Sequence, residues 1–137
     1  EGSDPALPPV LIGSHLDTQW AGGKYDGILG VLAGLEILRT LDDLGIRTKR
    51  PIEVVNWTNE EGARFSPPML CSLAWSGAAT EDWVNARVDK DGVHFGDALA
   101  GIGYRGEEPV GGREIDSYFE LHIEQAPALD EAGVPVG

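Results

Sequence analysis

Residues 10–44, VLIGSHLDTQWAGGKYDGILGVLAGLEILRTLDDL, join a short apolar run to a long amphipathic one through a polar, glycine-containing loop. The run Val10–Ser14 predicts a buried strand. Between 27 and 44 the apolar residues recur at helical spacing, and Gly45 follows as a natural C-terminal stop, so an amphipathic helix is predicted there. The apolar positions are 28, 31, 32, 35, 38, 41 and 44.

Two further segments have the character of strands. Residues 52–58 (IEVVNWT) are nearly continuously apolar, which is typical of strands buried in a parallel sheet. Residues 117–124 (SYFELHIE) alternate, which places Phe119, Leu121 and Ile123 on one face. Short helices are expected at 67–75, 80–87 and 96–102, and a turn at 89–92. Strands that alternate with helices predict an α/β domain.

The composition excludes several classes of protein. Lys and Arg number 10 against 23 Asp and Glu, a net charge of −13, which argues against nucleic acid and anionic membranes as partners. No apolar run approaches the roughly 18 residues of a membrane helix, and there is no signal-peptide pattern. A single cysteine, Cys71, rules out an internal disulfide and predicts a reducing compartment such as the cytoplasm.

The ends of the sequence predict a segment of a longer protein. The chain opens on Glu1 rather than on Met, and it ends at Val136-Gly137, where a new apolar segment begins. We therefore expect residues 1–137 to be part of a larger domain.

Metal-binding side chains follow each predicted strand. His15 and Asp17 come after the first strand, the pair Glu60-Glu61 comes after the second, and His122 lies near the end of the third. Asp26 ends the loop before the long helix. Ligands gather at the carboxyl ends of parallel strands, and a mixture of His and carboxylates suits zinc or manganese.

This combination of residue types matches the requirements of metal-assisted hydrolysis. A carboxylate can bridge two metal ions that together activate water and polarise a carbonyl. In a Glu-Glu pair, one residue can bind metal while the other transfers protons. Asp17, two residues after His15, can accept the second imidazole N–H and fix the tautomer.

Each motif also has a plain structural explanation. His-x-Asp is usually structural, Asp26 can cap the helix that follows it, a Glu-Glu pair is usually solvated, and His122 can be a core histidine. Only the occurrence of all of them at successive strand ends favours a metal site.

Four motifs, taken together, resemble the family of N-carbamoyl-L-amino-acid hydrolases, allantoate amidohydrolases and β-ureidopropionases. They are GSHLDT (13–18), GGKYDGILGV (22–31), NWTNEEGARF (56–65) and ELHIEQ (120–125). This family is part of a larger group of dinuclear metallohydrolases that includes the aminoacylase and carboxypeptidase-G enzymes. The resemblance covers nearly the whole chain. It implies a three-layer catalytic domain with a mixed, largely parallel sheet.

The resemblance also implies a role for each residue. His15, Asp26 and His122 would bind one metal, with Asp26 bridging to a second that Glu61 also binds. The metals would be two divalent ions (Zn2+, or Mn2+ or Co2+), whose bound hydroxide attacks the carbonyl of a small ureido or carbamoyl substrate. Glu60 would be the general base. The remaining roles would be orientation of His15 by Asp17 and substrate contact by Gln125 and Arg64.

In that family the chain is longer, with an inserted lid domain that forms a homodimer, and a last His ligand and a substrate-binding Arg follow the point where this sequence ends. His94 is expected to be a surface or packing residue. Trp20, Cys71 and Ala126 depart from the family pattern, and Ala126, in place of Gly, is expected to alter the turn at Gln125. An N-acyl amino acid or peptide substrate, or an inactive metal-binding segment, remains an alternative.

Overall fold

A computed structural model describes all 137 residues as an α/β arrangement. The elements, in chain order, are β1 (Val10–Ser14), α1 (Ile28–Asp43), β2 (Ile52–Asn56), α2 (Leu70–Trp75), α3 (Glu81–Asn85), α4 (Phe95–Gly101), β3 (Ser117–Phe119) and α5 (Ala128–Ala132). The strands form one sheet in the order β2-β1-β3, and both pairings are parallel. The predicted α/β class with a largely parallel sheet is confirmed. None of the helices has the length and apolarity needed to cross a membrane.

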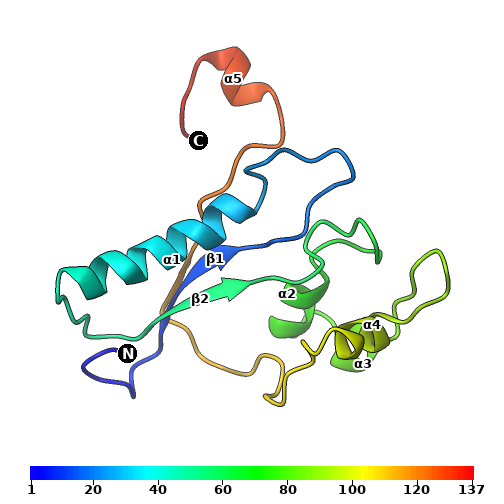
Figure 1. Cartoon of the computed structure of the whole chain (residues 1–137), viewed down its shortest axis with the longest axis horizontal. Coiled ribbons are helices and arrows are strands. Elements are labelled where there is room, and N and C mark those ends of the chain that lie inside the picture. The colour runs from blue at the N-terminus through cyan, green and yellow to red at the C-terminus, as the bar shows by residue number, and fades with distance from the viewer.

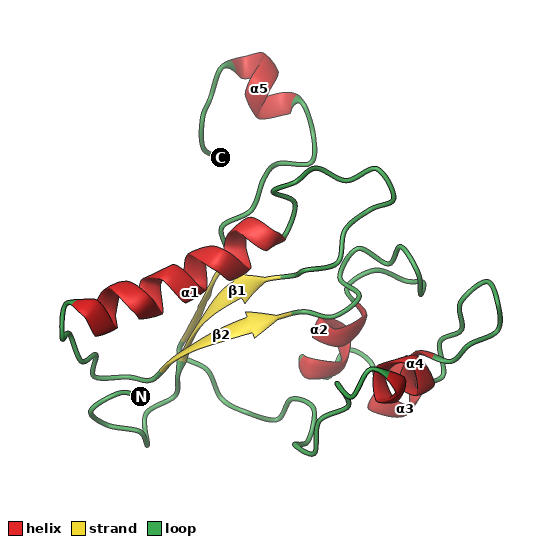
Figure 2. Ribbon diagram, viewed as in Figure 1, coloured by secondary structure: helices red, strands yellow, loops and turns green.

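The sheet and α1 form the framework of the molecule. α1 runs along β1 and β2, whereas α2, α3 and α4 gather beyond the carboxyl end of β2 (Figure 1). Long loops join these elements, and α5 lies apart from the sheet near the C-terminus (Figure 2). The carboxyl ends of the strands therefore meet the loops that carry most of the polar motifs.

Helix α1 packs against the sheet through glycines, not through the large apolar residues that predicted it. Gly30 and Gly34 are its buried residues, and a Cβ at Gly34 would lie 3.2 Å from the Ile12 side chain. Leu32 and Leu35, by contrast, are 52% and 48% exposed. The predicted helix is confirmed, and glycines make its closest approach to the sheet because no side chain fits between the two backbones there.

The third strand is shorter than the predicted 117–124. β3 ends at Phe119, which pairs with Ile12. Beyond it the Leu121 carbonyl turns toward α1, where Gly30 leaves room for it. The side chains of Glu120 and His122 then contact Ser14, the last residue of β1, and His15, which follows it. After Phe119, side-chain contacts replace the backbone hydrogen bonds that pair β3 with β1.

A second, small core lies away from the sheet. It is built from α2, α3, α4 and the segment before them, and its buried members are Phe65, Leu70, Ala74, Val84 and Phe95. Phe65 and Phe95 meet edge to face with ring centroids 5.3 Å apart. This core anchors the loop that follows β2, and with it the Glu60-Glu61 pair.

Candidate metal centre

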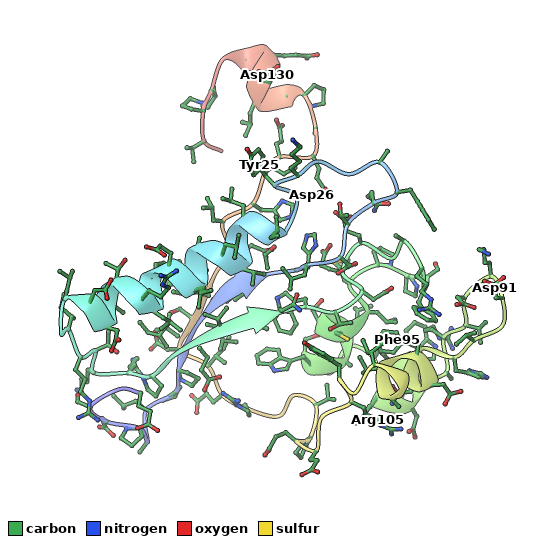
Figure 3. The ribbon with its side chains drawn as sticks, viewed as in Figure 1. Tyr25, Asp26, Asp91, Phe95, Arg105 and Asp130 are labelled. Carbon is green, nitrogen blue, oxygen red and sulfur yellow. The ribbon has the colours of Figure 1, made fainter.

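Four segments bring His and carboxylate side chains to the carboxyl edge of the sheet. His15 follows β1 directly, Glu60 and Glu61 follow β2, and His122 follows β3. Asp26 lies at the start of α1, as Figure 3 shows. Two sets have ligand atoms within 4.8 Å of one another, namely His15 with Asp26 and His122, and His15 with Glu60 and Glu61. The structure thus brings all five proposed metal-centre residues together, while their roles stay predictions.

The two histidine rings face each other in a way that favours a cation. His15 is fully buried, and its Nε2 lies 3.0 Å from Nε2 of His122. The Nδ1 atoms lie 2.7 Å and 2.6 Å from the backbone carbonyls of Asp17 and Ile123. Carbonyls only accept, so both Nδ1 atoms carry hydrogen, and the two Nε2 atoms are the ring positions left for a ligand. Two nitrogen lone pairs at this distance repel unless a proton or a metal ion is shared between them.

Asp26 adds a buried carboxylate to the histidine pair. Its side chain is 5% exposed, and its Oδ1 lies 3.4 Å from Nε2 of His122. It does not cap α1, because the N-cap residue is Gly27 and no side chain caps the helix. The capping explanation of Asp26 is therefore wrong. A buried carboxylate needs a charged or hydrogen-bonding partner, and the donor set of two imidazoles and a carboxylate suits a divalent metal ion.

Asp17 positions the Glu60-Glu61 pair more directly than it positions His15. Its two carboxylate oxygens accept hydrogen bonds from the backbone N–H groups of Glu60 and Glu61, at 3.1 Å and 3.0 Å. The His15 ring instead donates to the Asp17 carbonyl, and its Nδ1 is 4.0 Å from the nearer carboxylate oxygen. The expected contact from His15 to Asp17 thus exists, but on a different atom, because the carboxylate is engaged by the turn after β2.

Replacing Asp17 with Ala in the full-length protein is expected to weaken metal binding about 10- to 100-fold, the usual effect of losing a group that positions a ligand. Both backbone N–H groups would lose their acceptor, and the turn carrying Glu61 would loosen. Metal affinity by isothermal titration calorimetry tests this.

Asp89→Ala is the matched control for Asp17. The Asp89 carboxylate also accepts two backbone hydrogen bonds, from Asp91 and Val93, but at the 89–92 turn, away from the candidate centre. The Asp89→Ala variant should therefore leave metal affinity unchanged. Equal affinity losses in both variants would contradict a specific role for Asp17.

The turn that carries the glutamates is held by contacts that the sequence did not indicate. Asn59, 7% exposed, has a left-handed backbone (φ 56°). Its amide donates to the Phe65 carbonyl at 2.8 Å and its side-chain oxygen accepts from the Phe65 N–H. The Glu60 carbonyl accepts from the N–H of Met69. Asn tolerates this backbone better than most residues, which is the one local signal that could have identified it.

The Glu60 side chain lies beside the His15 ring. Its Oε2 is 3.5 Å from Nε2 of His15. Burial raises the pKa of the Glu60 carboxyl, with His15 opposing the shift and the carboxylates of Glu61 and Asp17 adding to it. A partly buried carboxyl next to the candidate ligands has the position of a proton-transfer group.

Two glutamine amides hold Glu61. Gln19 donates to its Oε2 at 2.7 Å and to its carbonyl at 3.1 Å. Gln125 donates to its other oxygen, Oε1, and also to Oδ1 of Asp26 at 2.7 Å. Sequence analysis missed Gln19, because nothing in its surroundings distinguishes it from a loop residue.

The turn at Gln125 has its left-handed backbone at Gln125 and not at the alanine that follows. The left-handed residue is Gln125 itself, with φ 56°, and Ala126 is not among the residues with positive φ. The left-handed position is thus one residue before Ala126, and the expected difference from the family's turn stays a prediction.

Two other predicted features lie away from the cluster. Arg64 pairs with Asp89 at 3.0 Å and lies over the Phe65 ring, so its substrate contact stays a prediction. His94 is exposed at the start of α4, as expected of a surface residue.

Cys71 and Trp20, both departures from the family pattern, also differ in their surroundings. Burial raises the pKa of the Cys71 thiol to about 11, which favours its interpretation as a packing residue. Trp20 is 87% exposed in the loop after His15.

A polar chain beside the cluster was also missed. Glu120 accepts from the buried Ser14 hydroxyl at 2.5 Å and from the Tyr118 hydroxyl at 2.7 Å, and Trp57 donates to Tyr118 at 3.0 Å. Burial and the bond to Glu120 raise the pKa of the Tyr118 hydroxyl. This chain ties β3 to β1 immediately before His15 and His122.

Comparison with known proteins identifies similar chains. Residues 11–137 match the model of peptidase family M20/M25/M40. An N-carbamoyl-L-amino-acid amidohydrolase of Rhizobium meliloti is 57% identical over 99% of this chain and 33% of its own length. A ureidoglycolate hydrolase of Oryza sativa subsp. japonica is 39% identical over 100% of this chain and 30% of its own.

Among solved structures, a hydantoinase/carbamoylase family amidase of Burkholderia ambifaria has a TM-score of 0.92 at 55% identity, covering 97% of this chain and 33% of that one. This chain thus spans about a third of the length of the relatives it matches.

Proposed function

The chain belongs to peptidase family M20/M25/M40, and we propose that it provides most of the metal centre of an amidohydrolase that cleaves a C–N bond in an N-carbamoyl amino acid or a related ureido compound. The family assignment rests on a match over residues 11–137. The substrate class is inferred from relatives named for N-carbamoyl-L-amino acids and for ureidoglycolate.

One observation supports the metal centre most strongly. The Nε2 atoms of His15 and His122 face each other at 3.0 Å, while both Nδ1 atoms are engaged by carbonyls. Asp26 completes a three-residue set around this point. We infer that these three residues hold one divalent ion, and that Asp26 and Glu61 hold a second. Zn2+, Mn2+ and Co2+ all suit such ligands.

The chain's own residues would then divide the reaction between them. When bound, the ions supply polarisation of the substrate carbonyl and lower the pKa of the attacking water. Glu60 removes a proton from that water and returns it to the nitrogen of the breaking C–N bond. The Asp17 carboxylate keeps Glu60 in place by accepting a hydrogen bond from the Glu60 backbone N–H. An N-carbamoyl amino acid yields the free amino acid, CO2 and ammonia.

A substrate panel tests the proposed activity in the full-length protein. We expect hydrolysis of an N-carbamoyl-L-amino acid, allantoate or ureidoglycolate, at least about tenfold faster in kcat/KM than hydrolysis of an N-acetyl amino acid or a dipeptide. That ratio corresponds to about 1.4 kcal/mol of transition-state discrimination. Ammonia release measures the first group and amine release the second. Preference for the dipeptide would contradict the ureido assignment while leaving the metal centre intact.

The remaining expectations belong to the same proposal. Residues 1–137 would be a part of the catalytic domain, and the full-length enzyme would be a cytoplasmic homodimer. Gln125 and Arg64 would contact substrate, although the Arg64 guanidinium must first leave Asp89.

A further inference from the structure

The Gln125 side chain lies between two carboxylates that belong to different segments. Its amide nitrogen donates to Oδ1 of Asp26 at 2.7 Å and to Oε1 of Glu61. Asp26 precedes α1, and Glu61 follows β2. An amide NH2 group has two hydrogens, so these two bonds use both of them. Gln125 is thus the group that joins the Asp26 and Glu61 carboxylates.

This position is the one assigned above to the second metal ion. Two carboxylates that converge on one point repel each other unless a donor or a cation lies between them. Here the donor is a neutral amide, which offsets the negative charge of the two carboxylates less than a divalent ion would. Gln19 donates to the other oxygen of Glu61, Oε2, so of the two amides only that of Gln125 joins Glu61 to Asp26.

The backbone at Gln125 supports a specific role for its side chain. Gln125 is one of three non-glycine residues with positive φ, and the other two, Asn59 and Met69, hold the turn of Glu60 and Glu61. Such conformations are unfavourable for residues with a Cβ and concentrate at functional sites. The segment after β3 therefore adopts a strained turn that directs this amide into the cluster.

We propose that Gln125 is a competitor for the second cation: its amide bridges Asp26 and Glu61 when the ion is absent and leaves when the ion binds. The first ion, at His15, Asp26 and His122, meets less competition, because no amide donates to the histidine Nε2 atoms; beside each other they have only carboxylate oxygens, of Glu60 at 3.5 Å and of Asp26 at 3.4 Å. The two ions accordingly bind in a fixed order and with unequal affinities. This inference rests on the two-metal centre of the proposed function.

Titration of the metal-free full-length protein with Co2+ tests the proposal, followed by calorimetry and by visible absorbance of the bound ion. The wild type should bind two ions with clearly separated affinities. Gln125→Ala should bind the weaker ion at least about tenfold more tightly, because two hydrogen bonds to carboxylates no longer oppose it. Gln125→Gly should do the same, and it also accepts the positive φ without strain.

Gln19→Ala is the matched control. It removes an amide from the same glutamate, but not from between the two carboxylates, and it should not tighten the second ion. Equal second-site affinity in wild type and both Gln125 variants would overturn the competition while leaving the two-metal centre standing. Failure of every protein to bind Co2+ would overturn the proposed function and this inference with it.

Discussion

Replacing Glu60 with Gln in the full-length protein is expected to lower kcat by about 10²- to 10⁴-fold, the usual contribution of a general acid–base, while the metal content stays unchanged. Gln preserves the size of the side chain but cannot take a proton from water. We expect the ions to be retained because Glu60 is not one of the proposed ligands. The Gln125 amide joins Glu61, and not Glu60, to Asp26. Steady-state kinetics and metal analysis by mass spectrometry measure the two quantities.

A suitable control for Glu60→Gln is Glu36→Gln on α1. The Glu36 side chain is 70% exposed and forms only a surface pair with Arg39. The same loss of negative charge there should leave kcat within a few-fold of the wild type. Activity of Glu60→Gln close to that of the control would remove Glu60 from the reaction, and loss of metal along with activity would make it a ligand instead.

Gly27→Ala is expected to abolish metal binding by displacing His15. Gly27 has φ 72°, and a Cβ there would overlap the His15 ring, lying only 2.6 Å from Nε2. The ring is fully buried and cannot move outward. We expect a loss of roughly 2–5 kcal/mol in the free energy of unfolding, from left-handed strain plus overpacking. Urea denaturation and calorimetric metal titration measure these effects.

Gly45→Ala separates the effect of left-handed backbone strain from the effect of overpacking against His15. Gly45 has a similar φ, 64°, but a Cβ there would meet nothing within 4 Å. This variant should lose only the strain contribution, about 1–2 kcal/mol, and should bind metal normally. If Gly27→Ala binds metal as well as Gly45→Ala does, the His15 ring is not confined as the structure shows.

The sequence predicted where the candidate ligands lie better than it predicted how they are held. His15 and the Glu60-Glu61 pair follow strands, and parallel strands place such residues at one edge whatever the details of packing. The contact from Asp17 to the backbone of that pair joins residues far apart in the chain, so local spacing favoured the nearer His15 instead.

The errors in the fold have a similar origin. The apolar pattern that predicted α1 includes Leu32 and Leu35, which are half exposed, and leaves out Gly30 and Gly34, the buried residues of the helix. A hydrophobic pattern gives weight to large side chains and none to glycine, although close backbone packing requires the absence of a side chain. Alternation likewise extended the third strand beyond Phe119, because alternation does not reveal where hydrogen bonding to a neighbour stops.

The glycine contact between α1 and the sheet would limit the size of ion that the proposed metal centre accepts. A Cβ at Gly30 would lie 2.7 Å from that of Ser14 and 2.6 Å from the Leu121 carbonyl, and these residues immediately precede His15 and His122. The main chains before both histidines therefore press against the helix that begins just after Asp26. Because these backbones are already in contact with α1, the site could adjust to a larger ion only by rotation of the ligand side chains. Selectivity between Zn2+ and the larger Mn2+ would then depend on rotamer freedom at His122, the more exposed of the two imidazoles.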